Sequence, residues 1–374
     1  MRFLFYTHSL VSDWNHGNAH FLRGVMRELI AMGHAAHALE PAEGWSRHCL
    51  LQDQGTAAIE SFDKDFPELS SETYQNDFDH EAAIAGADIV IVHEWTEPKL
   101  VARIGRARRR GGRFRLIFHD THHRAVTSRE EIAGLDLEGY DLVLAFGETL
   151  RERYLRAGWG RQVLTWHEAA DTRLFRPMPD IERTADLIWI GNWGDGERSR
   201  ELRTYLIEPA AQLGLSGTVR GVRYPDEAVV AIRNAGLGYG GWIVNARVPS
   251  AFARHRLTVH VPRRPYVAAL PGIPTIRMFE ALACGIPLVS APWDDAEGLF
   301  RAGKDFLFAR DGADMRRRMQ FLLEEPQAAA DLAASGLRTI LDRHTCRHRA
   351  AELLAFLEVE PADAAGRPKQ EALQ

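Results

Sequence analysis

The residues whose types and spacing are best suited to chemistry lie in segment 271–292, which reads PGIPTIRMFEALACGIPLVSAP. Pro274 and Thr275 mark a helix start, because threonine is a common N-cap residue and proline is favoured near a helix N-terminus. The N–H groups of a first helical turn have no partner within the helix. Such a helix start binds phosphate, and Arg277 in the first turn can add a charge-assisted contact to a pyrophosphate. Glu280 follows on the same face and can accept hydrogen bonds from ribose hydroxyls. The alternative is an ordinary capped helix with Glu280 in solvent.

A glycine-rich turn at residues 191–196, GNWGDG, is a second candidate for contact with phosphate. Gly191 and Asn192 open this turn after a predicted strand, and glycines there allow the backbone to approach phosphate closely. The spacing is not G-x-G-x-x-G, so the turn is not a dinucleotide-binding fingerprint. Arg198 and Arg200 begin the next helix, and either can face a diphosphate or lie on the surface.

Histidines and acidic residues follow two predicted strands in the first half of the chain. His119 and Asp120 begin the sequence HDTHH at residues 119–123, directly after a strand predicted at 115–118, and His93 with Glu94 ends the preceding strand. An imidazole or a carboxylate at such a place can orient a substrate hydroxyl or act as a base. We predict His119 and Asp120 as the catalytic pair, with His93 and Glu94 as the rival pair. The adjacent histidines lack the i, i+4 spacing of a helical zinc site, so no metal ligand is predicted.

These residues must be positioned by alternating strands and helices. Short apolar runs alternate with stretches of helical period, which is typical of parallel α/β architecture. The first series begins with a strand at 2–6 and a helix at 18–32, and a new series begins with a strand at 186–190. We therefore predict two Rossmann-like domains whose parallel sheets face a central cleft, since ligands bind outside the carboxyl ends of such strands.

The predicted boundaries are 1–178 for the first domain and 179–357 for the second, because Pro177 and Pro179 separate the two series. Residues 358–374 are rich in alanine, proline and charge and are predicted to form a disordered tail. Residues 40–79 are polar and are predicted to be an irregular insertion over the open face of the first domain.

Composition and charge restrict the partners and the compartment. A chain of 374 residues is too long for a single hydrophobic core. Its net charge of −5 gives no reason to expect nucleic acid as a partner. The three cysteines lie far apart, which fits a reducing compartment. No uncharged apolar run approaches the roughly 20 residues of a membrane span, so a cytoplasmic protein is predicted. The basic run from Arg103 to Arg115 can contact a membrane surface weakly or be a solvated helix face.

Three sequence segments resemble a known class of enzymes. FEALACGIPLVSAP, residues 279–292, resembles the donor-binding segment of family-4-like glycosyltransferases of the GT-B fold. PTIRMFEALACG, residues 274–285, resembles still more closely the CgeB-like, or spore-maturation-protein-like, branch. HEAADTRLFRP resembles the inter-domain segment of the same superfamily, with Asp171, Phe175 and Pro177 at the matching positions.

One position departs from the family pattern. The family has a further glutamate eight residues before the one matched by Glu280, and Gly272 stands there in this chain. In the family that glutamate contacts the transferred sugar, whereas the residue matched by Glu280 contacts the ribose. The resemblance therefore implies nucleotide binding but leaves the sugar, and retention or inversion at its anomeric carbon, open.

The resemblance implies a glycosyltransferase that moves a sugar from a nucleoside diphosphate sugar, with uridine as the usual nucleotide. It implies no metal ion and no cofactor, and the acceptor is open among glycans, lipids and small molecules. The second domain would hold the donor through the residues already named, which are Gly191, Asn192, Arg198, Arg200, Pro274, Thr275, Arg277 and Glu280.

The first domain would hold the acceptor. The loop that contains His16, Gly17 and Asn18 corresponds to the loop that faces acceptor and donor phosphate in GT-B enzymes, although Asn18 is equally suited to cap the following helix. Two alternative functions stay open: a sugar-nucleotide epimerase of the same architecture, and a non-catalytic nucleotide-sugar binder, which the glycine at position 272 would suit. The oligomeric state is not predicted.

Overall fold

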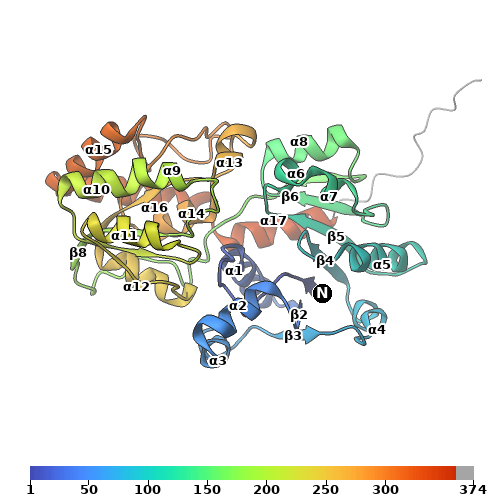
Figure 1. Ribbon diagram of the computed structural model, residues 1–374. Helices are drawn as coiled ribbons and strands as arrows, with labels where there is room; N and C mark the ends of the chain where they lie inside the picture. Colours follow the sequence, from blue (N-terminus) through green and yellow to red (C-terminus); the bar gives the residue numbers. More distant parts are fainter. Residues whose placement is uncertain (359–374) are drawn as a thin grey trace, which may run out of the picture.

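The computed structural model describes residues 1–358, which form two parallel sheets flanked by helices (Figure 1). The first sheet contains β1 (Arg2–Tyr6), β2 (Ala35–Pro41), β3 (Ser71–Tyr74), β4 (Ile89–His93), β5 (Arg115–Asp120), β6 (Leu142–Ala145) and β7 (Val163–Thr165). Its order from edge to edge is β3-β2-β1-β4-β5-β6-β7. The predicted tail lies, apart from its first residue, outside the described residues.

The second sheet repeats this pattern after the predicted break. It contains β8 (Ala185–Ile190), β9 (Gly217–Arg220), β10 (Leu237–Tyr239), β11 (His255–His260), β12 (Leu288–Ser290) and β13 (Leu307–Phe308). The order is β10-β9-β8-β11-β12-β13, and the strand pairs of both sheets are parallel. All five residues of β4, IVIVH, are buried. Their nearly continuous apolar run is what a parallel strand covered on both faces requires.

Helices of the first domain cover both faces of its sheet. They are α1 (Asn18–Ala31), α2 (Trp45–Gln54), α3 (Ala57–Asp65), α4 (His80–Ala85), α5 (Pro98–Arg109), α6 (Arg124–Thr127), α7 (Arg129–Ala133) and α8 (Glu148–Ala157). α1 buries Phe21, Val25 and Leu29 at helical spacing. α8 ends at Gly158 with φ of 69°, a left-handed conformation that glycine adopts without a steric penalty.

The prediction of an irregular insertion at residues 40–79 is wrong. The segment forms α2, α3 and the edge strand β3, which pairs with β2. Phe62 and Phe66, four residues apart, are 5% and 2% exposed, and both rings contact the guanidinium of the buried Arg23. The sequence prediction missed these elements because few of their residues are buried. Phe62 is the buried residue of α3, Ser46 and Leu50 are those of α2, and no residue of β3 is fully buried.

Helices of the second domain surround its sheet in the same way. They are α9 (Ser199–Leu202), η1 (Arg203–Ile207), α10 (Glu208–Leu213), α11 (Asp226–Asn234), η2 (Asn245–Arg247), α12 (Val248–Ala253), α13 (Arg264–Ala269), α14 (Ile276–Ala283), α15 (Gly312–Glu324) and α16 (Pro326–Arg343). α9, η1 and α10 are one helix with a π-type turn at η1. Pro209 follows this turn and has no N–H to donate, which accounts for the change of hydrogen-bond register.

The last described helix, α17 (Cys346–Glu358), packs against α1 of the first domain (Figure 1). The indole of Trp166 donates to the carbonyl of Arg349 at 2.9 Å. Ala170 and Thr345 form a parallel bridge, so the chain crosses between the domains twice at neighbouring places. The sequence-based division gave this helix to the second domain, whereas its contacts are with the first.

The basic run predicted as a surface feature lies on and just after α5. Several of its arginines are paired, since Arg103 contacts Glu81 at 2.8 Å and Arg108 contacts Asp141 at 2.9 Å. No helix within residues 1–358 is long and apolar enough to cross a membrane.

Close packing of α17 on α1 predicts a sensitive glycine. A Cβ at Gly24 would lie 2.5 Å from Sγ of Cys346 and 2.8 Å from Cβ of Asp171, so Gly24→Ala should destabilise the fold by about 1–3 kcal/mol through overpacking. Gly86→Ala is the matched control, because a Cβ there meets ordinary contacts of 3.5 Å and 3.7 Å. Urea denaturation measures both, and equal stability of the two variants would contradict the packing.

Candidate active site

A cleft of about 370 Å³ lies between the two domains. Its walls are the segments that follow β1, β2, β4, β5, β6 and β7 in the first domain and β8, β9, β10 and β11 in the second. These are the carboxyl ends of the parallel strands, where ligands bind in open α/β sheets. The predicted position of the site is therefore the position of the cleft.

Three arginines gather at the second-domain wall of the cleft: Arg198, Arg263 and Arg277. Arg198 is 8% exposed and donates to the backbone carbonyl of Asn192 at 2.8 Å and to its Oδ1 at 2.6 Å. Burial, and then the charges of Arg263 and Arg277, lower the pKa of Arg198 to about 9. Like charges this close in a buried place favour an anionic ligand.

Arg263 was missed by the sequence prediction. Its guanidinium contacts Glu197 at 2.7 Å and Oδ1 of Asn192 at 3.1 Å. Burial raises the pKa of Glu197, but hydrogen bonds from His123 and Arg263 outweigh it and bring the pKa to about 2. The available signal was the pair of arginines in VPRRP directly after a strand, at the cleft-facing end.

The start of α14 contributes free N–H groups beside these arginines. Thr275 occupies the N-cap position with extended backbone, and its side chain makes no capping hydrogen bond. Its Oγ1 lies 3.2 Å from Nε2 of His260 and lines the cleft. Pro274 precedes the cap and is not among the cleft-lining residues. The helix start predicted from PTIR is confirmed, and it faces the cleft.

Glu280 lies behind the cleft wall with its side chain 0% exposed. Its Oε1 is 2.7 Å from Nδ1 of His20, and its Oε2 is paired with Arg277. Burial raises the pKa of Glu280, but the charge of Arg277 and the hydrogen bond from His20 lower it by more. Both oxygens are engaged within the protein, so the ribose contact stays a prediction.

The departure at Gly272 has a steric reason. Gly272 has φ of 87°, and a Cβ there would lie 2.6 Å from Cγ of Glu297. Glu297 accepts a hydrogen bond from the backbone of Glu148 at 2.8 Å and contacts His167 at 2.6 Å, both in the first half of the chain. A glutamate side chain at position 272 would collide with this contact between the domains.

The glycine-rich turn behaves as predicted in place but not in every residue. Gly191 lines the cleft, and a Cβ there would meet the Trp189 ring at 2.8 Å. Asn192 also lines it and donates to Asn15 of the first domain. Arg200 is 82% exposed, contacts Glu201 and does not line the cleft. Of the two arginines predicted to face a diphosphate, only Arg198 lines the cleft.

On the first-domain side, His16, Gly17 and Asn18 all line the cleft. The alternative that Asn18 caps α1 is wrong, because Gly17 is the N-cap and the Asn18 amide donates to Thr121.

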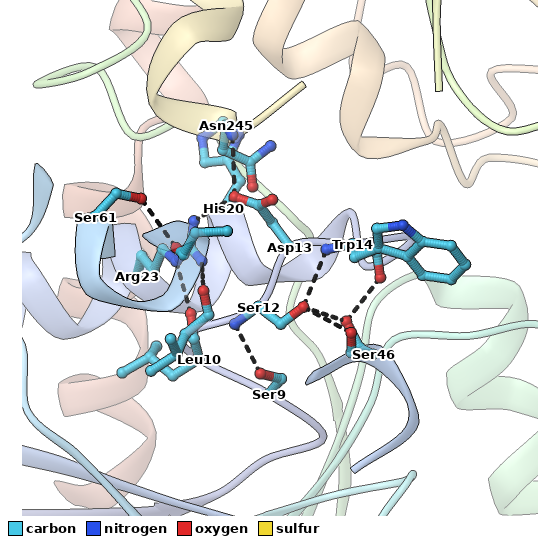
Figure 2. Close-up of polar contacts among 12 residues, drawn as sticks. Ser9, Leu10, Ser12, Asp13, Trp14, His20, Arg23, Ser46, Ser61 and Asn245 are labelled. Atoms are coloured by element: carbon cyan, nitrogen blue, oxygen red, sulfur yellow. Dashed lines mark hydrogen bonds and ion pairs between the residues drawn. The ribbon is translucent and has the colours of Figure 1, made fainter. Parts of the chain in front are cut away.

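Asp13 lies in the same loop and joins the two domains. Its Oδ2 accepts from the backbone of Asn245 at 3.0 Å and from Arg23 at 2.9 Å, and its Oδ1 accepts from Trp242 at 3.1 Å. Figure 2 shows Asp13 pointing toward Asn245, while Arg23 also reaches the carbonyl of Leu10. The loop is thus held in one position by a buried charge pair, which sets where the cleft-lining residues lie.

The predicted catalytic pair lies behind the wall of the cleft. His119 is 4% exposed and packs against Trp166, with ring centroids 4.8 Å apart. Asp120 is 0% exposed and accepts from Tyr154 at 2.7 Å and from the backbone of His122 at 3.0 Å. Thr121 and His122, the next two residues of HDTHH, line the cleft instead.

The rival pair is also buried. His93 and Glu94 are 6% and 1% exposed, and they contact each other at 3.0 Å between Nδ1 and Oε2. Nε2 of His93 lies 2.9 Å from Oγ1 of Thr121. Neither residue lines the cleft, and both contact the cleft-lining Thr121.

Several cleft residues had no signal in the sequence prediction. Trp45 and Trp95 are each 43% exposed at the cleft, beside the ring of His8. Glu168 is 4% exposed and lines the cleft, and burial, followed by the charges of Glu280 and Glu94, raises its pKa well above the usual range. These residues come from different loops that only the folded chain brings together.

Backbone strain is concentrated at the same place. Within the described residues, the non-glycine residues with positive φ are Asn15, Asp195 and Arg223, at 50°, 50° and 63°. All three line the cleft, and Asp195 contacts Arg223 at 2.8 Å. Strained residues of this kind cluster at binding and catalytic sites. Residues 1–358 contain no group of three or more potential ligands arranged to hold a metal ion.

Comparisons with known proteins agree with this geometry. Residues 200–355 match the model of a family described as glycosyl transferase-like. No curated protein matches the sequence. Three similar solved structures are sucrose-phosphate synthase from Thermosynechococcus elongatus, HepE from Anabaena in complex with UDP and glucose, and an α-glucosyltransferase in complex with UDP and a 13-mer DNA that contains an HMU base.

The likeness extends over both domains. Sequence identity is 14%, 16% and 11%, with TM-scores of 0.66, 0.68 and 0.69, respectively. The matches cover 96% of this chain in each case and 98%, 99% and 100% of the other chains. The protein has the GT-B fold, and its residues 200–355 are similar to a glycosyl transferase-like family. The predicted fold class and enzyme class are confirmed.

The buried carboxyl of Asp120 predicts a pH dependence of stability. Burial, and then the charge of Glu94, raise the pKa of Asp120 to about 7. A raised carboxyl pKa stabilises the fold fully below the unfolded-state pKa of about 4, and this contribution is lost as the pH rises through about 7.

Asp120→Asn cannot ionise, so its unfolding free energy should fall less than that of the wild type between about pH 4 and 7. Urea denaturation over this range measures the difference. An unchanged pH dependence would show that Asp120 is not the titrating group.

Proposed function

We propose that the protein transfers a sugar from a uridine diphosphate sugar to an acceptor held by the first domain. The observation that carries the proposal is the meeting of Arg198, Arg263, Arg277 and the start of α14 at one wall of the cleft. Four groups of positive potential around one small volume suit a diphosphate. The similar structures of HepE and α-glucosyltransferase hold UDP, which supports uridine as the nucleotide.

In this proposal the second domain acts on the leaving group. Negative charge builds on the diphosphate as its bond to the sugar breaks, and fixed donors stabilise that charge because they need no reorganisation. Arg198 is held by Asn192 and by the carbonyl of Val261 at 3.2 Å, which fixes it in place. Arg277, with its side chain 24% exposed, is held by its ion pair with the buried Glu280.

The first domain would present the acceptor hydroxyl. His8 lies between the exposed rings of Trp45 and Trp95, with centroids 6.4 Å and 6.0 Å from the two indoles. Burial, followed by the charge of His93, lowers the pKa of His8 to about 4. At neutral pH its imidazole is therefore uncharged and can accept a hydrogen bond from a hydroxyl group.

The finer predictions remain proposals. Assignment to the CgeB-like branch rests on residues 274–285, and cytoplasmic location rests on composition. Catalysis without a metal ion rests on the arginines and the start of α14 as counter-charges to the diphosphate. A weak membrane contact would use arginines of the basic run such as Arg106, which lines a groove on α5 together with Arg103 and Glu81.

The donor site predicts a large effect at one arginine. Arg277→Ala should weaken UDP binding and lower turnover by more than about tenfold at saturating acceptor, since a charge contact to the leaving group is lost. Arg317→Ala, on α15 and paired with Asp314, is the matched control with near-wild-type activity. UDP should raise the thermal midpoint of the wild type with the logarithm of its concentration above the Kd, and absence of this shift would refute the donor proposal.

The acceptor side predicts a separate effect. Trp95→Ala should raise the KM for the acceptor about tenfold and leave the Kd for UDP unchanged, because a flat apolar surface is removed from one wall only. Trp159→Ala serves as the control, since that indole packs on Tyr154 outside the cleft. Acceptors are found by screening for UDP release from UDP-glucose. A weaker affinity for UDP in Trp95→Ala would place this ring on the donor side instead.

A further inference from the structure

His20 lies where α1, the inter-domain segment and α14 meet. Its side chain and that of Glu280 are both 0% exposed. Nδ1 of His20 is 2.7 Å from Oε1 of Glu280, and Nε2 is 2.8 Å from the backbone nitrogen of Asp171. One side chain of the first domain therefore contacts both the segment that joins the domains and the helix that starts at the donor site.

The hydrogen bonds determine the protonation of this imidazole. The backbone N–H of Asp171 can only donate, so Nε2 of His20 accepts and carries no proton. The ring is then the neutral form with its proton on Nδ1, which donates to Glu280.

The plane of the ring is fixed as well. It stacks on Phe175 with centroids 4.0 Å apart and planes 7° apart. Any rotation of His20 would break this stacking together with both hydrogen bonds.

The contacts continue from Glu280 to the cleft. Its second oxygen, Oε2, is paired with Arg277, whose side chain is 24% exposed and lines the cleft. A carboxylate shielded from water needs partners for both oxygens, so losing His20 would leave Glu280 free to turn and to draw Arg277 with it. His20 does not contact Arg277 directly but affects its position through Glu280.

We propose that His20 is a positioning residue of the donor site: it holds Glu280 and, through Glu280, sets the direction of Arg277 toward the diphosphate. The proposal rests on the proposed function for the identity of the ligand. Inorganic pyrophosphate tests the same contact without assuming a nucleotide.

Isothermal titration calorimetry with UDP and with pyrophosphate tests the proposal. His20→Ala should raise the Kd for UDP about tenfold, the loss expected when one hydrogen bond to a charged group no longer supports the site. In the Arg277→Ala background, His20→Ala should add little, because both changes act on one contact. Additive losses in the double variant would overturn the proposal.

Two conservative variants keep the test decisive if His20→Ala fails to fold. His20→Asn retains a donor near Nδ1 and should restore most of the affinity. His20→Gln extends toward Asp171 instead and should behave as His20→Ala does. The reverse order would overturn the proposal. His80→Ala is the matched control, since His80 is buried, contacts the hydroxyl of Tyr6 at 3.1 Å and lies outside the cleft.

The outcomes separate this proposal from the proposed function. A wild type that binds neither UDP nor pyrophosphate refutes the donor site itself. A wild type that binds both, with a folded His20→Ala that binds equally well, overturns only the role of His20.

Discussion

Like charges held close together at one wall of the cleft are the constraint on which the rest of the site depends. Arg198, Arg263 and Arg277 repel one another, and the repulsion grows as their surroundings become less polar. Each is held by an acceptor that also belongs to the framework: Asn192 for the first two, with Glu197, and Glu280 for the third. A bound anion would complete this arrangement, because the acceptors only partly neutralise the three charges.

The same acceptors connect the site to the rest of the fold. Asn192 reaches Asn15, and Glu280 reaches His20, so two of the groups that hold the arginines also contact the first domain. Glu297 and Asp13 make further polar contacts across the boundary. The positions of the cleft arginines therefore depend on how the two domains are packed together. A substitution at these contacts between the domains should also shift the arginines.

The fold and part of the donor site follow from local sequence patterns. Strand β1, helix α8 and the start of α14 could be predicted because apolar period, a left-handed glycine and a Pro-Thr cap are local signals. The sequence could not predict that Arg198 lines the cleft and Arg200 does not. The two side chains at the start of one helix point in different directions, and only packing decides which of them faces the cleft.

The buried position of the predicted catalytic pair was missed for a related reason. The strand was expected to end at Phe118, which would have placed His119 and Asp120 in the loop that faces the cleft. β5 continues to Asp120, so both side chains pack within the sheet and its helices, and the loop begins at Thr121. A strand that ends two residues later than predicted buries side chains that were expected to line the cleft. Sequence patterns do not predict the end of a strand to within two residues. Trp45 and Trp95 come to lie beside His8 only through tertiary contacts, and neither carries a local signal.

The double crossing of the chain between the domains has a mechanical consequence. The bridge of Ala170 and Thr345 is flanked by backbone hydrogen bonds of 2.9 Å and 2.8 Å, which tie the two connecting segments side by side. Two tethers fastened to each other resist sliding and separation of the bodies they join, but they bend as a pair. Relative movement of the domains is thereby reduced toward rotation about a single line, so the two walls of the cleft would meet in the same register each time they close.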